Sequence, residues 1–279
     1  MNGRQWDEYE TMFGGYEFFR LYRDGKLSKP DFVHHMHARH DEIVAMGVAE
    51  YNFNRLLRCV SGNREVDAML EDFRRDGGLD TTDYGRDGFA EFSARVKPVY
   101  HNGSWITEIL PEDELCMYAL ASLTNPKHMF IAGAYFGYWA LWAMPAIQAN
   151  GGMCVLSDVN PAVIEIARRN MDALGYGPNA LCLAEDAEKL LLEGDGPIDL
   201  LALDANGSGD DPRPTHRGKR LYDPLLSAAR HRLHEGSYII VHNLERDSAE
   251  MQPFLSQIDS IATAKAELIS YNGLGIYKV

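Results

Sequence analysis

The sequence has few cysteines and no long apolar run. Only four cysteines occur among 279 residues, with no CxxC pair and no zinc-type spacing, so we interpret them as reduced thiols of a cytoplasmic protein. The longest apolar stretch, residues 129–149, contains Pro145 and two glycines, so we expect it to form a strand and a helix and not a membrane span. The first residues lack the basic start and apolar stretch of a signal peptide, so no export is expected.

Positive charge is scarce as well. The chain has 27 Lys and Arg against 41 Asp and Glu, a formal net charge of −14, so nucleic acids and anionic membranes would be repelled. Hydrophobic residues make up 46% and charged residues 24%, the balance of a soluble globular protein and not of a fibrous or disordered one. A small molecule is therefore the expected partner, with no nucleic acid and no membrane.

The two parts of the chain differ in their apolar pattern. Residues 1–104 carry aromatic and charged residues at helical spacing, which predicts a helical segment that covers the substrate site or mediates oligomerisation. In residues 105–279 short apolar runs alternate with helical segments, which predicts an α/β fold with a Rossmann-like, doubly wound, mostly parallel sheet. Asn272-Gly273 is predicted to join two antiparallel C-terminal strands. In such a sheet, ligands bind beyond the C-terminal ends of the parallel strands.

Polar and small residues follow the predicted strands at these ends. Gly133 and Gly137 come after the first strand, where backbone can approach a ligand closely, but the full G-x-G-x-x-G of a pyrophosphate site is missing, which disfavours NAD. Asp158 ends the second strand, where it can accept hydrogen bonds from ribose hydroxyls or cap the helix beginning at Pro161. Asp186 follows the third strand and can cap a helix or meet an adenine amino group.

Taken together, these motifs make residues 105–279 resemble the class I S-adenosylmethionine-dependent methyltransferases, and most of all the catechol and caffeoyl-CoA O-methyltransferase group. The matching signatures are Pro111-Glu112 before a helix, residues 131–138, Asp158-Val159-Asn160, Leu203-Asp204-Ala205 and His242-Asn243. The resemblance implies that S-adenosyl-L-methionine is the cofactor. It implies that the cofactor is bound by Gly133, Tyr135, Gly137, Asp158, Asp186 and Ala187, with Asp204 beside the methyl-transfer centre.

Several positions depart from the family pattern. Metal-dependent members hold a divalent cation with an Asp after the fourth strand and an Asp-Asn pair after the fifth, and these positions are Asp204, His242 and Asn243 here. An imidazole in place of a carboxylate weakens a site for hard cations, so an obligatory metal is doubtful. Gly207 stands where the family carries a lysine, and Ile131 where it carries an acidic residue that binds the cofactor's amino end.

We therefore predict that His242 is the general base and Asp204 its orienting partner, with a His that only hydrogen-bonds backbone as the alternative. Trp105, Tyr222 and Asn243 are expected to line the acceptor pocket, with Tyr135 and Trp139 as further aromatic candidates.

Methylation of a small molecule at oxygen is the favoured interpretation. Methylation at nitrogen or carbon, a non-catalytic cofactor-binding protein and a nicotinamide oxidoreductase stay open. The long connection at residues 206–220 is either a loop over the site or a mobile excursion. Four histidines, at positions 34, 35, 37 and 40, could bind a metal, although a solvated helix face is favoured. We further expect a homodimer and a cytoplasmic location.

Overall fold

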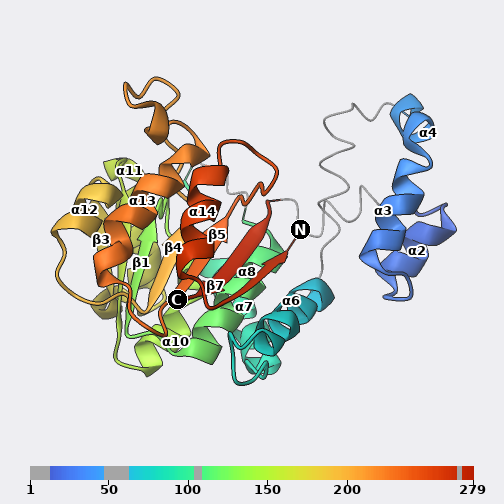
Figure 1. Cartoon of the computed structure of the whole chain (residues 1–279). Coiled ribbons are helices and arrows are strands. Elements are labelled where there is room, and N and C mark those ends of the chain that lie inside the picture. The colour runs from blue at the N-terminus through green and yellow to red at the C-terminus, as the bar shows by residue number, and fades with distance from the viewer. Residues whose placement is uncertain (1–12, 47–62, 104–108, 269–271) are drawn as a thin grey trace.

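The computed structural model describes residues 13–46, 63–103, 109–268 and 272–279. Within these ranges the chain forms one mixed sheet of seven strands in the order β3-β2-β1-β4-β5-β7-β6 (Figure 1). The strands are β1 His128–Ala132, β2 Met153–Asp158, β3 Ala180–Ala184, β4 Leu200–Leu203, β5 Tyr238–His242, β6 Ala264–Leu268 and β7 Leu274–Lys278. Strands β1 to β5 pair in parallel, whereas β7 is antiparallel to both β5 and β6. The predicted Rossmann-like sheet and its antiparallel C-terminal strand are confirmed.

Helices cover both faces of the sheet. They are α6 Asn63–Arg75, α7 Arg86–Val99, α8 Pro111–Thr124, α9 Tyr138–Leu141, α10 Met144–Ala149, α11 Pro161–Ala173, α12 Ala187–Glu193, α13 Tyr222–Ala229 and α14 Gln252–Ile261. Alternate residues of β1 point to opposite faces, as strand geometry requires. Met129 and Ile131 pack in the core shared with α6 to α11, and Phe130 and Ala132 in the core shared with α12 to α14. The sheet is therefore buried on both sides, which explains its almost continuously apolar strands.

The segment after β1 was expected to form one helix but forms two. Helix α9 ends at Leu141, and α10 begins at Met144 with Pro145 in its first turn. Proline lacks the N–H that a continuous helix would need there, and its fixed φ suits a helix start. The short α9 keeps Trp139 near the end of β1, next to the site described below.

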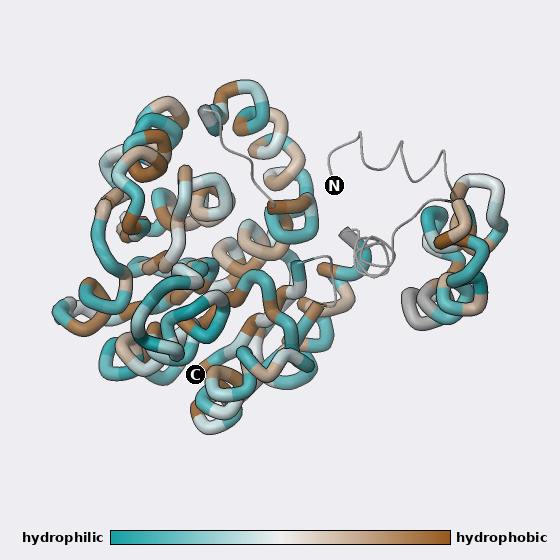
Figure 2. The backbone as a smooth tube through the Cα atoms, turned by 90° about the horizontal axis from the view of Figure 1, so that it is seen from above, coloured by the Kyte–Doolittle hydropathy of each residue, from teal (hydrophilic) through white to brown (hydrophobic). Residues whose placement is uncertain are grey.

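The N-terminal part contains helices of two kinds. Helices α6 and α7 contribute Leu70 and Phe92 to the core of the sheet. Helices α2 Glu17–Arg23, α3 Lys29–His37 and α4 His40–Ala45 form an apolar cluster of their own and lie to one side of the sheet and its helices in both views (Figures 1 and 2). The Tyr22 hydroxyl of α2 donates to Glu65 Oε1 of α6 at 3.0 Å. The predicted division at residue 104 stays a prediction.

Two composition-based expectations concern the cysteines and membranes. Cys116, Cys154 and Cys182 are free and buried, and Cys59 lies outside the described residues. None of the helices in the described part of the chain combines the length and apolar character needed to cross a membrane.

Candidate functional site

Three adjoining cavities lie at the carboxyl edge of the parallel strands. Their volumes are about 720, 250 and 190 Å³, and Gly133 lines all three. The predicted site residues that line at least one cavity are Gly133, Tyr135, Asp158, Asp186, Ala187, Asp204, His242 and Asn243. The fold thus brings together residues that are far apart in the sequence and follow β1, β2, β3, β4 and β5.

Two further predicted residues, Gly137 and Tyr222, line none of these cavities. Gly137 precedes α9 with a φ of 82°, and a Cβ there would lie 3.1 Å from the Cβ of Ala167, so it serves close packing of α9 on α11. Tyr222 is fully buried and lines none of the three cavities; its hydroxyl donates to the backbone carbonyl of His242 at 2.8 Å. Trp105 lies outside the described residues.

Asp158 connects two backbone turns at the two larger cavities. Its Oδ2 accepts the backbone N–H of Tyr135 at 3.0 Å, and its Oδ1 accepts that of Asn160 at 2.9 Å. Helix α11 is capped by Asn160, whose Oδ1 accepts the N–H of Ala162 at 3.0 Å, so Asp158 is not the cap that the sequence allowed. Burial raises the pKa of Asp158 despite these two donors. The carboxylate keeps lone pairs for further donors, such as hydroxyl groups of a ligand.

Asp186 caps a helix, which is one of the two roles that its sequence position allowed, and its predicted contact with adenine stays a prediction. Its Oδ1 accepts the backbone N–H of Glu188 at 2.8 Å and caps α12. Together with Ala187, Asp186 also lines the 250 Å³ cavity.

The centre of the site is a buried histidine between two carboxylates. His242 is 2% exposed; its Nδ1 lies 2.8 Å from Asp204 Oδ1 and its Nε2 lies 3.2 Å from Asp113 Oδ2. Burial alone would lower the pKa of His242, but the charges and hydrogen bonds of Asp204 and Asp113 outweigh it and raise the pKa to about 10. Two carboxylates that face the two ring nitrogens favour the charged imidazolium, which can donate from both nitrogens.

Asp113 is a site residue that the sequence motifs did not indicate. It lies in the first turn of α8, is fully buried, and its Oδ2 also accepts the N–H of Leu110 and the side-chain amide of Asn272, each at 2.8 Å. Only Pro111-Glu112 belonged to the recognised signature, so Asp113 could have been suspected from its place beside that pair and from nothing else in the sequence.

Lys219 is the second residue that the motifs missed. Its Nζ lies 2.9 Å from the Tyr222 hydroxyl, 3.1 Å from the Ala205 carbonyl oxygen and 3.5 Å from Asp204 Oδ1. Burial lowers the pKa of Lys219, although Asp204 acts in the opposite direction. A cation beside Asp204 is therefore present, but it comes from the loop after β4 and not from position 207.

These contacts bear on the alternative metal site. Both nitrogens of His242 face carboxylates, and Asp204 is close to both His242 and Lys219, so Asp204, His242 and Asn243 do not fit a divalent cation in this arrangement. Among the described residues, His34, His35, His37 and His40 included, no three His, Cys, Asp or Glu side chains are grouped to hold a metal ion.

Four aromatic side chains line the smallest cavity, which is called the aromatic cavity below. Tyr135, Phe136, Tyr138 and Trp139 line it beside His242, and the Trp139 ring centroid lies 5.2 Å from that of His242. The Trp139 indole N–H donates to the backbone carbonyl of Asp113 at 3.0 Å, which fixes the ring. This cavity offers flat apolar faces next to a charged group.

Solved structures of methyltransferases share this fold. A candidate O-methyltransferase from Klebsiella pneumoniae has a TM-score of 0.50 at 17% identity, over 79% of this chain and 91% of that chain. A methyltransferase from Geobacter sulfurreducens has a TM-score of 0.50 at 19% identity, over 68% of this chain and 88% of that chain. No protein-family model and no curated protein matches the sequence. The chain has the fold of the class I S-adenosylmethionine-dependent methyltransferases, as its motifs predicted.

Proposed function

We propose that this chain is an S-adenosylmethionine-dependent methyltransferase that acts on a small-molecule acceptor, with oxygen as the favoured methylated atom. The observation that carries the proposal is the position of Asp158, at the end of β2 and on the wall of both larger cavities. A carboxylate there suits the two hydroxyls of a ribose, which donate hydrogen bonds, better than it suits a phosphate group.

The charges around the largest cavity support this cofactor over a dinucleotide. Asp158, Asp204, Glu245 and Glu250 line that cavity, together with Lys219. When bound, S-adenosylmethionine supplies a methyl group on a positively charged sulfonium, which this lining would attract, whereas a pyrophosphate would be repelled. In this proposal Gly133 and Tyr135 lie at the methionine and ribose part. Asp186 and Ala187 lie at the adenine.

The acceptor is proposed to lie between the aromatic cavity and Asp204. Trp139 and Tyr135 would position a flat acceptor, with Asn243 on the same wall. The acceptor must lose a proton as it is methylated, and His242 stays the predicted base. That role requires His242 first to give up one of the protons that it shares with Asp204 and Asp113.

The raised pKa of His242 between two carboxylates favours a second candidate, a protein that binds the cofactor without turnover. A His242 that keeps both protons would act as a fixed cation that holds Asp204 and Asp113 in place. Methylation at nitrogen or carbon would use the same cavities. A homodimer and a cytoplasmic location remain predictions, and light scattering of the purified chain tests the first.

Turnover separates these candidates. The purified chain would be incubated with methyl-labelled S-adenosylmethionine and a panel of small phenols, alcohols, amines and carbon acids, and labelled product would be followed with S-adenosylhomocysteine. We expect label on a hydroxyl acceptor, and loss of transfer in Asp204→Asn. Label on amines alone would replace oxygen by nitrogen, and cofactor binding without label on any acceptor would support the non-catalytic candidate.

A further inference from the structure

The connection between β4 and α13 folds into a closed loop. At its neck, the N–H of Gly207 donates to the Gly218 carbonyl at 3.0 Å and the N–H of Gly218 donates to the Gly207 carbonyl at 3.1 Å. A Cβ on Gly207 would lie 1.7 Å from the carbonyl oxygen of His216, so this neck requires glycine. The loop, residues 206–218, is thus defined by its own backbone contacts, and it is not an open excursion.

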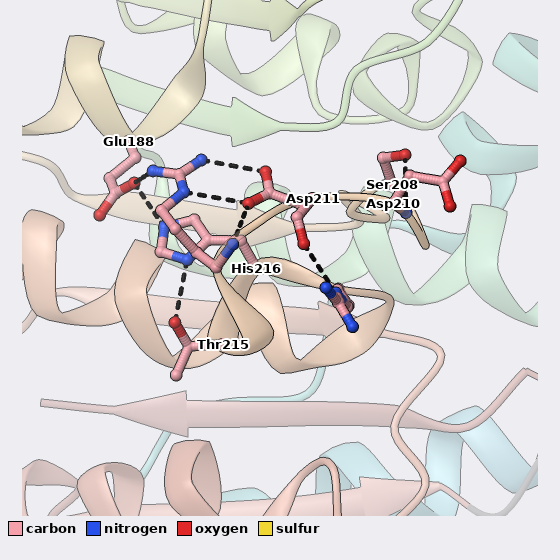
Figure 3. Close-up of polar contacts among 8 residues, drawn as sticks. Glu188, Ser208, Asp210, Asp211, Thr215 and His216 are labelled. Atoms are coloured by element: carbon pink, nitrogen blue, oxygen red, sulfur yellow. Dashed lines mark hydrogen bonds and ion pairs between the residues drawn. The ribbon is translucent and has the colours of Figure 1, made fainter.

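His216 attaches this loop to helix α12. Its Nε2 lies 2.8 Å from Glu188 Oε2, its Nδ1 lies 3.0 Å from the Thr215 hydroxyl, and the residue is 8% exposed. Figure 3 shows Glu188, Thr215 and His216 turned toward one another. The Arg213 guanidinium lies 3.5 Å from the same Glu188 oxygen. Two side chains of the loop, His216 and Arg213, therefore contact the Glu188 carboxylate.

A second set of contacts stiffens the loop internally. Asp211 Oδ1 accepts the backbone N–H of Arg213 at 2.8 Å and its guanidinium Nε–H at 3.1 Å. The side-chain hydrogen bond from Arg213 is the main reason why the pKa of Asp211 falls to about 2. The Arg217 guanidinium donates to the Asp211 carbonyl at 2.7 Å. Exposed ion pairs contribute little stability one by one, but together these contacts define one loop conformation.

The loop forms one wall of the 250 Å³ cavity. Asp211, Arg213 and His216 line the cavity from the loop, and Asp158 and Asp186 line it from the strand ends. Leu221 and Leu225 add apolar surface. The loop therefore faces the residues that the proposed function assigns to ribose and adenine. Asn206 and Gly218 at its two ends also line the largest cavity, but no loop residue lines the aromatic cavity.

We infer that the 206–218 loop is a preformed wall over the adenosine end of the cofactor site, and that His216 is the positioning residue that holds the wall against Glu188. This inference rests on the proposed function. A wall that is ordered before binding spares the ligand the entropic cost of ordering it, so releasing the wall should weaken binding. Because the wall lies at one end of the site, the loss should extend to any ligand that contains adenosine.

Two ligands test whether the loop acts on the adenosine part of the cofactor or on its amino-acid part. S-adenosylhomocysteine contains adenosine and the amino-acid part, whereas 5′-methylthioadenosine lacks the amino acid. We expect His216→Ala to weaken both ligands by a similar factor of about tenfold, the size of one lost charge-assisted hydrogen bond, measured by calorimetry on the full chain. His216→Gln, which can still donate to Glu188, should stay within about threefold of the parent.

Matched controls keep the test specific. His231→Ala removes an exposed histidine away from the cavities and should bind both ligands as the parent does. Glu188→Ala removes the carboxylate that both His216 and Arg213 contact, so it replaces His216→Ala as the test if that variant fails to fold. Trypsin cleavage after Arg217 should be faster in the variants that release the loop.

The outcomes separate this inference from the proposed function. Parent-like affinity in both His216→Ala and Glu188→Ala overturns the inference. Weakening of S-adenosylhomocysteine alone, or equal weakening in His231→Ala, overturns it as well. If the parent chain binds neither ligand, the proposed function fails, and the inference fails with it.

Discussion

Replacing His242 by glutamine would remove the positive charge between Asp113 and Asp204. Both carboxylates would keep a polar neighbour but lose their shared cation, at a site where His242 is 2% and Asp113 0% exposed. Breaking a buried ion pair by removing one partner typically costs about 3–5 kcal/mol. Lys219, 3.5 Å from Asp204, still offsets one of the two negative charges, so we expect a cost near the lower end, about 3 kcal/mol.

This free energy corresponds to a measurable shift in the unfolding midpoint. An unfolding entropy of about 2.1 cal/mol/K per residue gives about 0.6 kcal/mol/K for 279 residues, so about 3 kcal/mol lowers Tm by about 5 °C. The assay is thermal unfolding of the parent and His242→Gln, followed by circular dichroism. His231→Gln, which changes an exposed histidine, is the matched control and should keep the parent Tm.

The difference should also depend on pH in a defined direction. The pKa of His242 is raised to about 10 in the folded chain, above its usual value of about 6.5. The stabilisation from this proton is fully present below about pH 6.5 and is lost as pH rises through about 10. The Tm difference between parent and His242→Gln should therefore be largest at pH 6 and smallest above pH 10. Equal midpoints at pH 6, or a difference that does not change with pH, would refute a charged His242 and favour a neutral base.

Three further predictions concern the metal, the opposite end of the sheet and the loop. Chelator should leave product formation unchanged, because the candidate metal ligands bind one another; activity that is lost with chelator and restored by added metal would contradict this. Burial alone would raise the pKa of Asp199, but hydrogen bonds from the His128 N–H and the His234 ring help to lower it. The stability that ionised Asp199 contributes to the folded chain is therefore present above about pH 4 and is lost on acidification. When Tm is measured as a function of pH, Asp199→Asn should lose less Tm than the parent as the pH falls below about 4. Gly207→Ala places a Cβ 1.7 Å from the His216 carbonyl oxygen and should lower Tm by about 2–5 °C through an overpacking cost of about 1–3 kcal/mol; an unchanged Tm would refute the tight neck.

The strand-end residues were predictable because local patterns determine them. Apolar runs of strand length placed Gly133, Asp158, Asp204 and His242 at the ends of β1, β2, β4 and β5, and a parallel sheet collects such ends at one edge. The pairing of β4 with β5 then brings Asp204 next to His242. Asn272-Gly273 likewise indicated the C-terminal pair of antiparallel strands, β6 and β7.

The remaining contacts at the site depend on tertiary packing, which local patterns do not encode. Asp113 meets His242 across 129 positions of sequence, through the docking of α8 on the end of β5. Lys219 reaches Asp204 only because the loop after β4 closes at its glycine neck. Tyr222 had the residue type of a pocket wall, but the first turn of α13 buries it beneath the site. Charge partners that come from loops and helix starts are therefore what the sequence reading missed.

The central claim is that S-adenosylmethionine binds at the end of β2 through Asp158. The most direct test titrates the full chain with S-adenosylhomocysteine and, separately, with NADH in a calorimeter, for the parent, Asp158→Ala and the exposed control Asp195→Ala. We predict one bound S-adenosylhomocysteine per chain, no NADH binding, and a loss of affinity of about ten- to a hundredfold in Asp158→Ala alone, the size of a lost charge-assisted hydrogen bond. Binding of NADH without S-adenosylhomocysteine, or unchanged affinity in Asp158→Ala, would contradict the claim.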